Sequence, residues 1–168
     1  YPMGRQNRQH LSRYEAENPA VALTSVEEAE AFIGDLASEW SRGSSFFIGA
    51  FERATGGFVA QIYVGLRNAQ LPDYEIGYFA DVGHEGSGFV SEAVQAAIRV
   101  LFEEMEAQRL SLDCDDTNVR SARVAERCGF VLEGHIRRNR RNPDGSLSGT
   151  LHYGMLREEY ARLAEGLT

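Results

Sequence analysis

The sequence predicts one domain of the mixed α/β class, and three features support that prediction. The chain has 168 residues, 43% of them hydrophobic, which is enough to bury a single core. Short strand-like segments joined by turn sequences occur towards both ends, as expected for antiparallel hairpins. The middle of the chain has the order strand, helix, strand, which is the pattern of a crossover connection.

The first predicted element is a helix over residues 24–42. Ser25 is followed three residues later by Glu28, which is the spacing of a capping box, and Gly43 provides a stop. Short apolar runs follow, bounded by the turn Thr55-Gly56-Gly57 and by a loop around Pro72. These runs predict three strands, at 46–51, 58–66 and 74–82.

The second half of the chain alternates between helices and strands. Apolar residues at three- and four-residue spacing predict a helix over 88–107, and Gly129 provides the left-handed stop of a helix over 119–127. The turn sequence Asn142-Pro143-Asp144-Gly145 joins the last two strands. The strands of this half are predicted at 110–114, 130–138 and 147–156.

Composition excludes several classes of function. Lys and Arg total 17 against 25 Asp and Glu, and the net charge of −8 argues against a nucleic-acid partner. No run of 18 apolar residues occurs, which argues against a membrane-spanning helix, and we expect no membrane partner. Cys114 and Cys128 are too few for a disulfide framework, so we expect a cytoplasmic location. His84 and His152 lack zinc-ligand spacing to a partner, so we expect no metal.

Residues 81–93 carry the first chemical signal. They lead from a predicted strand through Gly86-Ser87-Gly88 into a predicted helix. Such a turn leaves backbone N–H groups unpaired in front of the positive end of the helix dipole, where a pyrophosphate can bind. A tight turn without a ligand is the alternative. A Walker loop is excluded because the chain has no Lys, and the dinucleotide fingerprint because Ser91 occupies its third glycine position.

Residues 113–134 carry the more specific signal. They contain the pattern Asn118-x-x-Ser121-x-x-x-x-Glu126-Arg127-x-Gly129-Phe130-x-x-Glu133-Gly134. Together with the upstream Gly-x-Gly turn, this pattern resembles the GNAT superfamily of N-acetyltransferases, and within it the RimJ/RimL-like branch of ribosomal-protein N-terminal acetyltransferases. Residues 7–11, residues 74–79 and Tyr153 add to a resemblance that covers nearly the whole chain. It implies a mostly antiparallel sheet of six to seven strands with a V-shaped split, flanked by about four helices.

The resemblance also implies a site for the cosubstrate acetyl-CoA between strands 74–82 and 110–114. Its pantetheine arm would pair with the first strand along Phe79, Ala80 and Val82, and would contact Asn118. Ser121 would lie near the sulfur, while Arg123, together with Arg120, would reach the adenosine phosphate. The pyrophosphate would lie on consecutive N–H groups of the turn, those of Gly86, Ser87, Gly88, Phe89 and Val90.

Acetyl transfer to an amine needs a proton acceptor, because an alkyl amine with a pKa near ~10.4 is almost entirely protonated at pH 7. Glu75 is the candidate base, since its strand leads into the expected coenzyme site. The alternative is a structural carboxylate, paired with an Arg or at the top of the sheet. Ser121 is the first candidate to protonate the leaving thiolate, and Tyr153 is the second. A hydroxyl at a helix N-terminus is the alternative for Ser121.

The sequence departs from the family pattern at three places. Glu85 stands where the family has Gln or Arg, and Val90 stands where it has Gly or Ala. A carboxylate beside a pyrophosphate is unfavourable, so we expect Glu85 to turn outward. Six strands are visible where the family has seven, so residues 1–168 are predicted to form a single acetyltransferase domain without the family's first strand.

The predicted function is direct transfer of an acetyl group from acetyl-CoA to a primary amine, on either a protein N-terminus or a small molecule. The alternative is a non-catalytic domain of the same fold that binds coenzyme A or a partner. The cluster Arg137–Arg141 either contacts an acidic polypeptide or RNA, or forms a solvated hairpin. The family also suggests a homodimer, and the sequence does not identify the acceptor.

Overall fold

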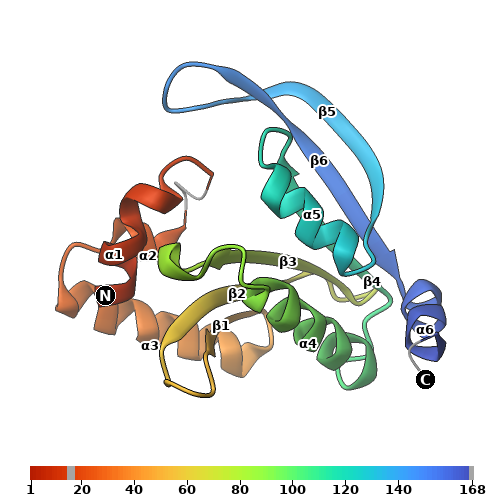
Figure 1. Cartoon of the computed structure of the whole chain (residues 1–168). Helices are drawn as coiled ribbons and strands as arrows, with labels where there is room; N and C mark the ends of the chain where they lie inside the picture. The colour runs from red at the N-terminus through yellow and green to blue at the C-terminus, as the bar shows by residue number, and fades with distance from the viewer. Residues whose placement is uncertain (15–17, 167–168) are drawn as a thin grey trace.

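The computed structural model describes residues 1–14 and 18–166, which form six strands, six α-helices and one 3₁₀ turn (Figure 1). The elements in chain order are α1 (Pro2–Leu11), α2 (Pro19–Ala22), α3 (Val26–Arg42), β1 (Ser45–Phe51), β2 (Phe58–Asn68), β3 (Asp73–Ala80), η1 (Val82–His84), α4 (Phe89–Glu103), β4 (Arg109–Asp115), α5 (Val119–Arg127), β5 (Val131–Arg141), β6 (Leu147–Leu156) and α6 (Arg157–Glu165).

The six strands form one sheet in the order β1-β2-β3-β4-β6-β5. Every neighbouring pair is antiparallel except β3 and β4. This parallel pair joins only residues 73–75 to residues 109–111, so the two strands separate beyond Glu75. In Figure 1 the β5–β6 hairpin arches away from β3 on the far side of this separation. The predicted mixed, mostly antiparallel sheet with a V-shaped split is therefore confirmed.

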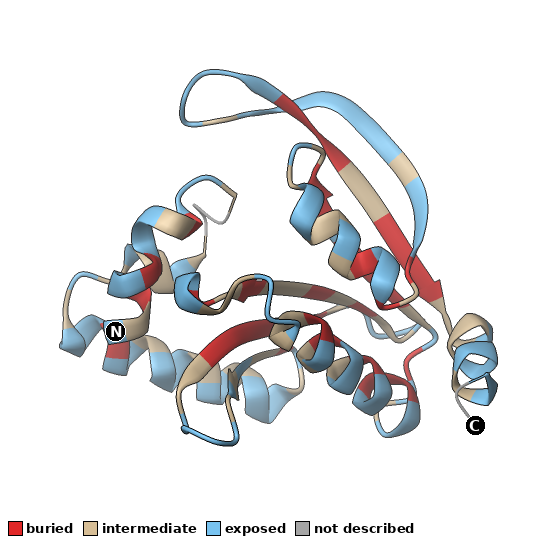
Figure 2. Ribbon diagram, viewed as in Figure 1, coloured by how far each residue is buried: buried red, intermediate tan, exposed pale blue. Residues whose placement is uncertain are grey.

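The hydrophobic core lies between the sheet and α4, with α5 continuing it along β4 and β6 (Figure 2). Val94, Ile98 and Leu101 are at most 3% exposed, because they form one stripe of α4 that packs on β2 and β3. Cys128 is buried in the same core, as expected for a small apolar side chain. Helix α3 packs on the outer strand β1, where the rings of Phe32 and Phe47 meet edge to face.

The ends of β3 and α4 fall earlier than predicted. Strand β3 ends at Ala80 and not at Val82, because the Asp81 carboxylate accepts a hydrogen bond from the N–H of Gly83 (3.1 Å) and begins η1. Helix α4 ends at Glu103 and not at residue 107. There the N–H of Ala107 donates to the carbonyl of Leu101 (2.9 Å) across Glu106, whose φ is 56°. A Gly usually occupies such a left-handed position, so nothing in the sequence marks this end.

Two short helices, α2 and α6, add to the four that were expected. Helix α6 begins directly after β6, where the Glu159 carboxylate accepts a hydrogen bond from the N–H of Leu156 (2.8 Å). Strand β5 also extends three residues beyond its predicted end, to Arg141, with irregular pairing near Gly134 and after Ile136. Within residues 1–14 and 18–166, no helix combines the length and the apolar character needed to cross a membrane.

Candidate functional site

Two cavities meet where β3 and β4 separate. A loop-side cavity of about 760 Å³ lies among the glycine-rich turn, the first turns of α4 and α5, and the end of α1. A hairpin-side cavity of about 1070 Å³ lies among α3, the outer strands and the β5–β6 hairpin, and Glu75 lines it. A narrow space of about 50 Å³, lined in part by Gly77, Tyr78 and Cys114, shares residues with both. The narrow space therefore lies at the split between the two cavities, and we call it the passage.

The glycine-rich turn presents free N–H groups to the loop-side cavity. Gly86 and Gly88 have φ values of 74° and 87°, a left-handed conformation that favours glycine. In the described part of the chain, the N–H groups of Gly88, Phe89 and Val90 have no hydrogen-bond acceptor, as is usual for the first turn of a helix. The N–H of Ser87 makes a long bond to the His84 carbonyl (3.4 Å). Gly86, Gly88 and Val90 line the cavity directly.

The turn is fixed to the N-terminal helix by buried polar groups. Asn7 of α1 is fully buried; its amide donates to Asp81 (2.8 Å) and its carbonyl oxygen accepts from the N–H of Val82 (2.7 Å). Burial raises the pKa of Asp81, but hydrogen bonds from Asn7, His84 and Gly83 outweigh this effect, so its pKa lies below the usual value. The carboxylate is therefore held ionised and fixes the start of the turn.

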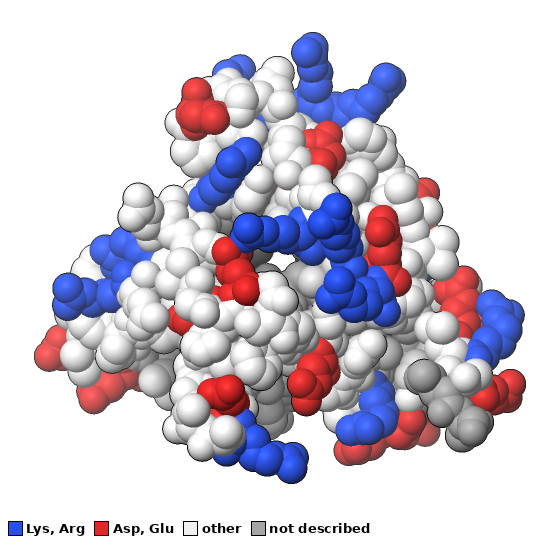
Figure 3. All heavy atoms as spheres, viewed as in Figure 1, with Lys and Arg blue, Asp and Glu red and all other residues white. Residues whose placement is uncertain are grey.

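The loop-side cavity is basic although the protein is acidic. Its described lining contains four arginines, Arg13, Arg120, Arg123 and Arg127, and a single carboxylate, Glu85. Figure 3 shows basic side chains gathered around a hollow on this face, with acidic groups against them. Four cations beside free N–H groups favour a ligand that carries several negative charges.

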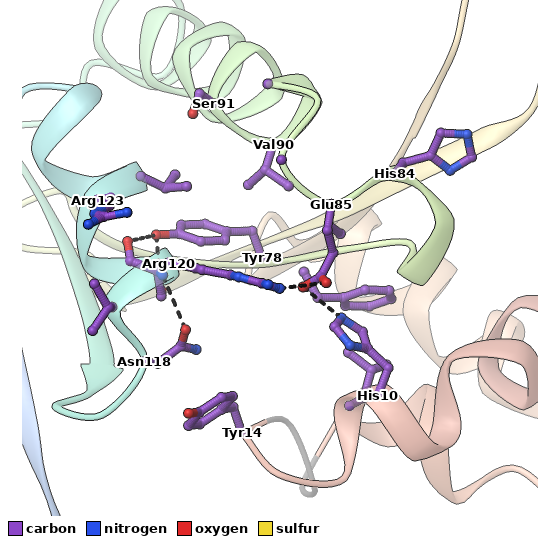
Figure 4. Close-up of a pocket in the computed structure, with 18 of the residues that line it drawn as sticks. His10, Tyr14, Tyr78, His84, Glu85, Val90, Ser91, Asn118, Arg120 and Arg123 are labelled. Carbon is purple, nitrogen blue, oxygen red and sulfur yellow. Dashed lines mark hydrogen bonds and ion pairs between the residues drawn. The ribbon is translucent and has the colours of Figure 1, made fainter.

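Glu85 does not turn outward, so that prediction was wrong. Its carboxylate lies 2.5 Å from the guanidinium of Arg120 and 3.5 Å from the ring of His10 (Figure 4). The attraction of two neighbouring groups on α5 and α1 holds it at the edge of the cavity. Arg120 is thus engaged by a carboxylate, whereas Arg123 lines the cavity without an ion pair in the described part of the chain.

Ser121 lies beside the passage and is bonded to a residue that the sequence analysis missed. Its hydroxyl donates to the hydroxyl of Tyr78 (3.2 Å), which itself donates to the carbonyl of Ser121 (2.9 Å). Tyr78 lines both cavities and the passage, and burial raises its pKa. Asn118 caps α5 by accepting from the N–H of Ser121 (3.2 Å). Side chains alternate between the two faces of a strand, so Tyr78 lies on the face of β3 opposite to Glu75. This alternation is the sequence signal that could have identified Tyr78.

Glu75 lies at the vertex of the split. It is the last residue of β3 that pairs with β4, opposite Ser111, and it lines the hairpin-side cavity. Its side chain is half-buried and forms no hydrogen bond or ion pair with any described residue. The alternative in which Glu75 pairs with an Arg is therefore wrong. The neighbouring Arg67 instead donates to Ser111 (3.0 Å).

Two predicted site residues lie elsewhere. Tyr153 is 2% exposed, and its hydroxyl donates to Glu126 (3.3 Å), outside the lining of either cavity. Burial and the Glu126 carboxylate raise its pKa to about 12. Val82 lies beyond the end of β3, and its N–H donates to Asn7, so this N–H is not available to a ligand. By contrast, Phe79 and Ala80 both line the loop-side cavity.

The split sheet, the glycine-rich turn and the basic cavity together define a class of mixed α/β domain with a site for a polyanionic ligand, and sequence comparison specifies the family. The chain belongs to the acetyltransferase (GNAT) domain family, whose profile matches residues 4–131. The resemblance stated from the two motifs is therefore confirmed.

Individual relatives agree with this assignment. The chain is 41% identical over 63 residues to the ribosomal-protein-serine acetyltransferase of Escherichia coli, a match that covers 38% of this chain and 35% of the relative. The first curated relatives are thus matched over little more than a third of their length. The putative ribosomal N-acetyltransferase YdaF of Bacillus subtilis is 28% identical over 92% of this chain and 82% of its own.

Solved structures share the fold. The ribosomal L7/L12 alpha-N-protein acetyltransferase RimL, solved in complex with coenzyme A, superposes with a TM-score of 0.82 at 20% identity, covering 92% of this chain and 85% of that one. At this identity the likeness establishes the common architecture of the split sheet. The roles of individual residues rest on the geometry described above.

Proposed function

We propose that the protein is an acetyl-CoA-dependent N-acetyltransferase that moves an acetyl group directly to a primary amine. The observation that carries the proposal is the passage at the split, which connects a basic cavity rich in free N–H groups to a second cavity that holds an unpaired carboxylate. A thioester on one side and an amine on the other would meet there. Family membership supports the same reaction.

The loop-side residues fit a coenzyme with a pyrophosphate. The free N–H groups of Gly88, Phe89 and Val90 lie at the positive end of the α4 dipole and would hold the pyrophosphate. Beyond residue 75 the edge of β3 that faces β4 is unpaired, which supports pairing of the backbone of Phe79 and Ala80 with an extended pantetheine arm. Arg123 and Asn118 would contact the remaining parts of the coenzyme. Acetyl-CoA, when bound, supplies the activated acyl group.

Glu75 is the proposed proton acceptor for the amine. Its half-buried carboxylate lines the hairpin-side cavity and forms no ion pair with a described residue, so it can contact an amine directly or through one water. It acts from the hairpin side, where the acceptor would enter.

Ser121 is proposed to stabilise the departing thiolate by a hydrogen bond, with solvent supplying the proton that the sulfur takes up, and Tyr78 is proposed to orient Ser121. The Ser121 hydroxyl donates to the Tyr78 hydroxyl, and the Tyr78 hydroxyl donates to the backbone carbonyl of Ser121, so the two bonds fix the Ser121 side chain beside the passage. The Cys114 thiol also lines the passage, but burial raises its pKa to about 11, so little thiolate is available for a covalent intermediate. The scarcity of thiolate at Cys114 supports direct transfer.

The acceptor is proposed to be a primary amine on a protein N-terminus or a small molecule. Relatives named ribosomal-protein acetyltransferases favour the former. Arg140 and Arg141 line the hairpin-side cavity, while Arg137 and Arg138 line a separate shallow hollow, so only part of the arginine cluster is placed to contact an acceptor. A single domain over residues 1–168, a homodimer, a cytoplasmic location and the absence of metal, nucleic-acid and membrane partners stay predictions.

Calorimetric titration with acetyl-CoA, followed by a thiol-release assay over peptides and small amines, tests the proposal. We expect saturable binding at one site and thiol release with one class of amine. Binding without release on any amine would favour the alternative, a non-catalytic domain that binds coenzyme A. No binding at all would refute the assignment of the loop-side cavity.

A further inference from the structure

Glu85 connects three segments that are distant in the sequence. It is the residue that ends η1, and its two carboxylate oxygens face different partners: Oε2 lies 2.5 Å from Nη1 of Arg120, and Oε1 lies 3.5 Å from Nε2 of His10. Arg120 belongs to the first turn of α5 and His10 to the last turn of α1. We call this group the Glu85 bridge, and Figure 4 shows it across the loop-side cavity below Val90 and Tyr78.

The Glu85 bridge lies in the part of the cavity where the arginines and the free N–H groups of the turn favour an anion. Glu85 directly precedes Gly86 and lies three to five residues before the free N–H groups of the turn. It is the single acidic residue in the described lining of this cavity, against four arginines. A fixed negative charge here repels the phosphates of a coenzyme. It also forms an ion pair with Arg120, one of the cations that would attract them.

The two contacts of the bridge are of the kind that a ligand can replace. The Arg120 side chain is 76% exposed, and ion pairs at exposed positions contribute little to stability. A phosphate offers the same guanidinium more acceptor oxygens and more negative charge than one carboxylate does. Arg120 has no second ion-pair partner among the described residues, so it is free to change partner.

We infer that Glu85 competes with the coenzyme for Arg120 and thereby sets the affinity of the loop-side cavity. When the coenzyme binds, Arg120 exchanges the Glu85 carboxylate for a phosphate oxygen, and Glu85 stays beside His10. Glu85 is a determinant of affinity and takes no part in the chemistry. The inference rests on the proposed function, because it takes the ligand of this cavity to be coenzyme A.

The test is calorimetric titration of the full chain with coenzyme A under reducing conditions, at about 0.15 M salt. Removing one charge within a few ångströms of a phosphate should tighten binding about tenfold, so Glu85→Gln and Glu85→Ala should both show this gain. Agreement between the two variants separates loss of the charge from a new contact made by the Gln amide. Arg120→Gln should weaken binding about fivefold.

Glu92→Gln is the matched control. It removes the same charge from the first turn of α4, where Glu92 is exposed and lines neither cavity. We expect it to change the dissociation constant less than twofold, because salt screens an exposed charge at that distance. Thermal melting of each variant verifies that the fold is retained.

Salt dependence provides a second measurement. The advantage of Glu85→Gln over the native chain should shrink as salt rises from 0.05 to about 0.5 M, because the opposing charge is increasingly screened. Equal or weaker binding by both Glu85 variants, with coenzyme A still bound by the native chain, would overturn the inference and leave the proposed function intact. Unchanged binding by Arg120→Gln would overturn the exchange at Arg120. Failure of every folded variant to bind coenzyme A would refute the proposed function itself.

Discussion

The loop-side and hairpin-side cavities differ in how the chain builds them. Most of the loop-side cavity comes from two short continuous segments, 78–91 and 117–127, with one further contribution from α1. The hairpin-side cavity draws on α3, all three strands from β1 to β3, β4 and the β5–β6 hairpin. The first has four arginines and one carboxylate, whereas the second has three arginines and four carboxylates.

The difference shows which half of a two-substrate site a local motif can encode. Helix N-termini and glycine turns create an anion site wherever they occur, because the N–H groups belong to consecutive residues. The acceptor half depends on side chains brought together by strand register, as Glu75 and Asp113 are. The positive and negative charges of the hairpin-side cavity nearly cancel, so its specificity depends on the positions of individual side chains. Four predictions sharpen this contrast, from the largest effect to the smallest.

Glu75→Gln should produce the largest effect. Loss of the proton acceptor should lower kcat by about 10²–10³ while the dissociation constant of acetyl-CoA stays unchanged, because general-base catalysis contributes on this scale and Glu75 lies on the hairpin side. Steady-state kinetics and calorimetry measure the two quantities. Glu39→Gln is the control, since Glu39 lines the same cavity but accepts a hydrogen bond from Ser45. A kcat within threefold of the native value would place the base elsewhere.

Asn7→Ala should lower both the stability of the fold and the affinity of the loop-side cavity for the coenzyme. It leaves Asp81 and the N–H of Val82 without their buried partner, which costs about 2–3 kcal/mol. Thermal melting should show a Tm lower by about 5–10 °C, together with weaker coenzyme binding. Gln6→Ala removes an exposed and longer bond to the same carboxylate (3.3 Å) and should lower Tm by no more than about 2 °C. Equal melting of both variants would mean that the burial of Asn7 is unimportant.

Ser121→Ala and Tyr78→Phe should each lower kcat by about tenfold, and the double variant should be little worse than either one. Residues that act through one hydrogen bond give such non-additive effects. Tyr153→Phe is the control, because its hydroxyl bonds to Glu126 away from the cavities, and it should change kcat less than twofold. Strictly multiplicative losses for Ser121 and Tyr78 would show that the two hydroxyls act independently.

Acid titration should give the smallest effect. The folded pKa of Asp81 is lowered, so its contribution to stability is present above the unfolded value near ~3.9 and is lost as pH falls through the folded pKa. The native chain should therefore be more stable than Asp81→Asn at pH 7, and the gap should narrow below about pH 4. Urea unfolding between pH 7 and 3 measures this difference. A gap that is constant with pH would contradict the assigned shift.

The sequence predicted correctly those element ends that are marked by a capping residue or by a glycine stop. Ser25 and Gly43 bound α3, and the Cys128-Gly129 stop ends α5, as the structure confirms. The end of α4 was missed because Glu106 takes the left-handed position that Gly normally holds. Strand β3 was predicted two residues too long because the N–H of Val82, which would have continued the strand, donates to Asn7, 75 residues away. Signals that act within one turn are readable from the sequence, and contacts between distant segments are not.

The sequence by itself determined the glycine-rich turn with its free N–H groups, because these follow from consecutive residues and their backbone conformations. Its two motifs also resembled the family, and that resemblance implied the split-sheet fold. Only the tertiary structure decided the positions of four side chains. It placed Glu75 unpaired at the vertex, Tyr78 against Ser121 and Tyr153 outside the cavities, and it turned Glu85 inward towards Arg120. The physical reason is that the direction of a side chain depends on the partners that packing brings within reach, and those partners lie on other elements.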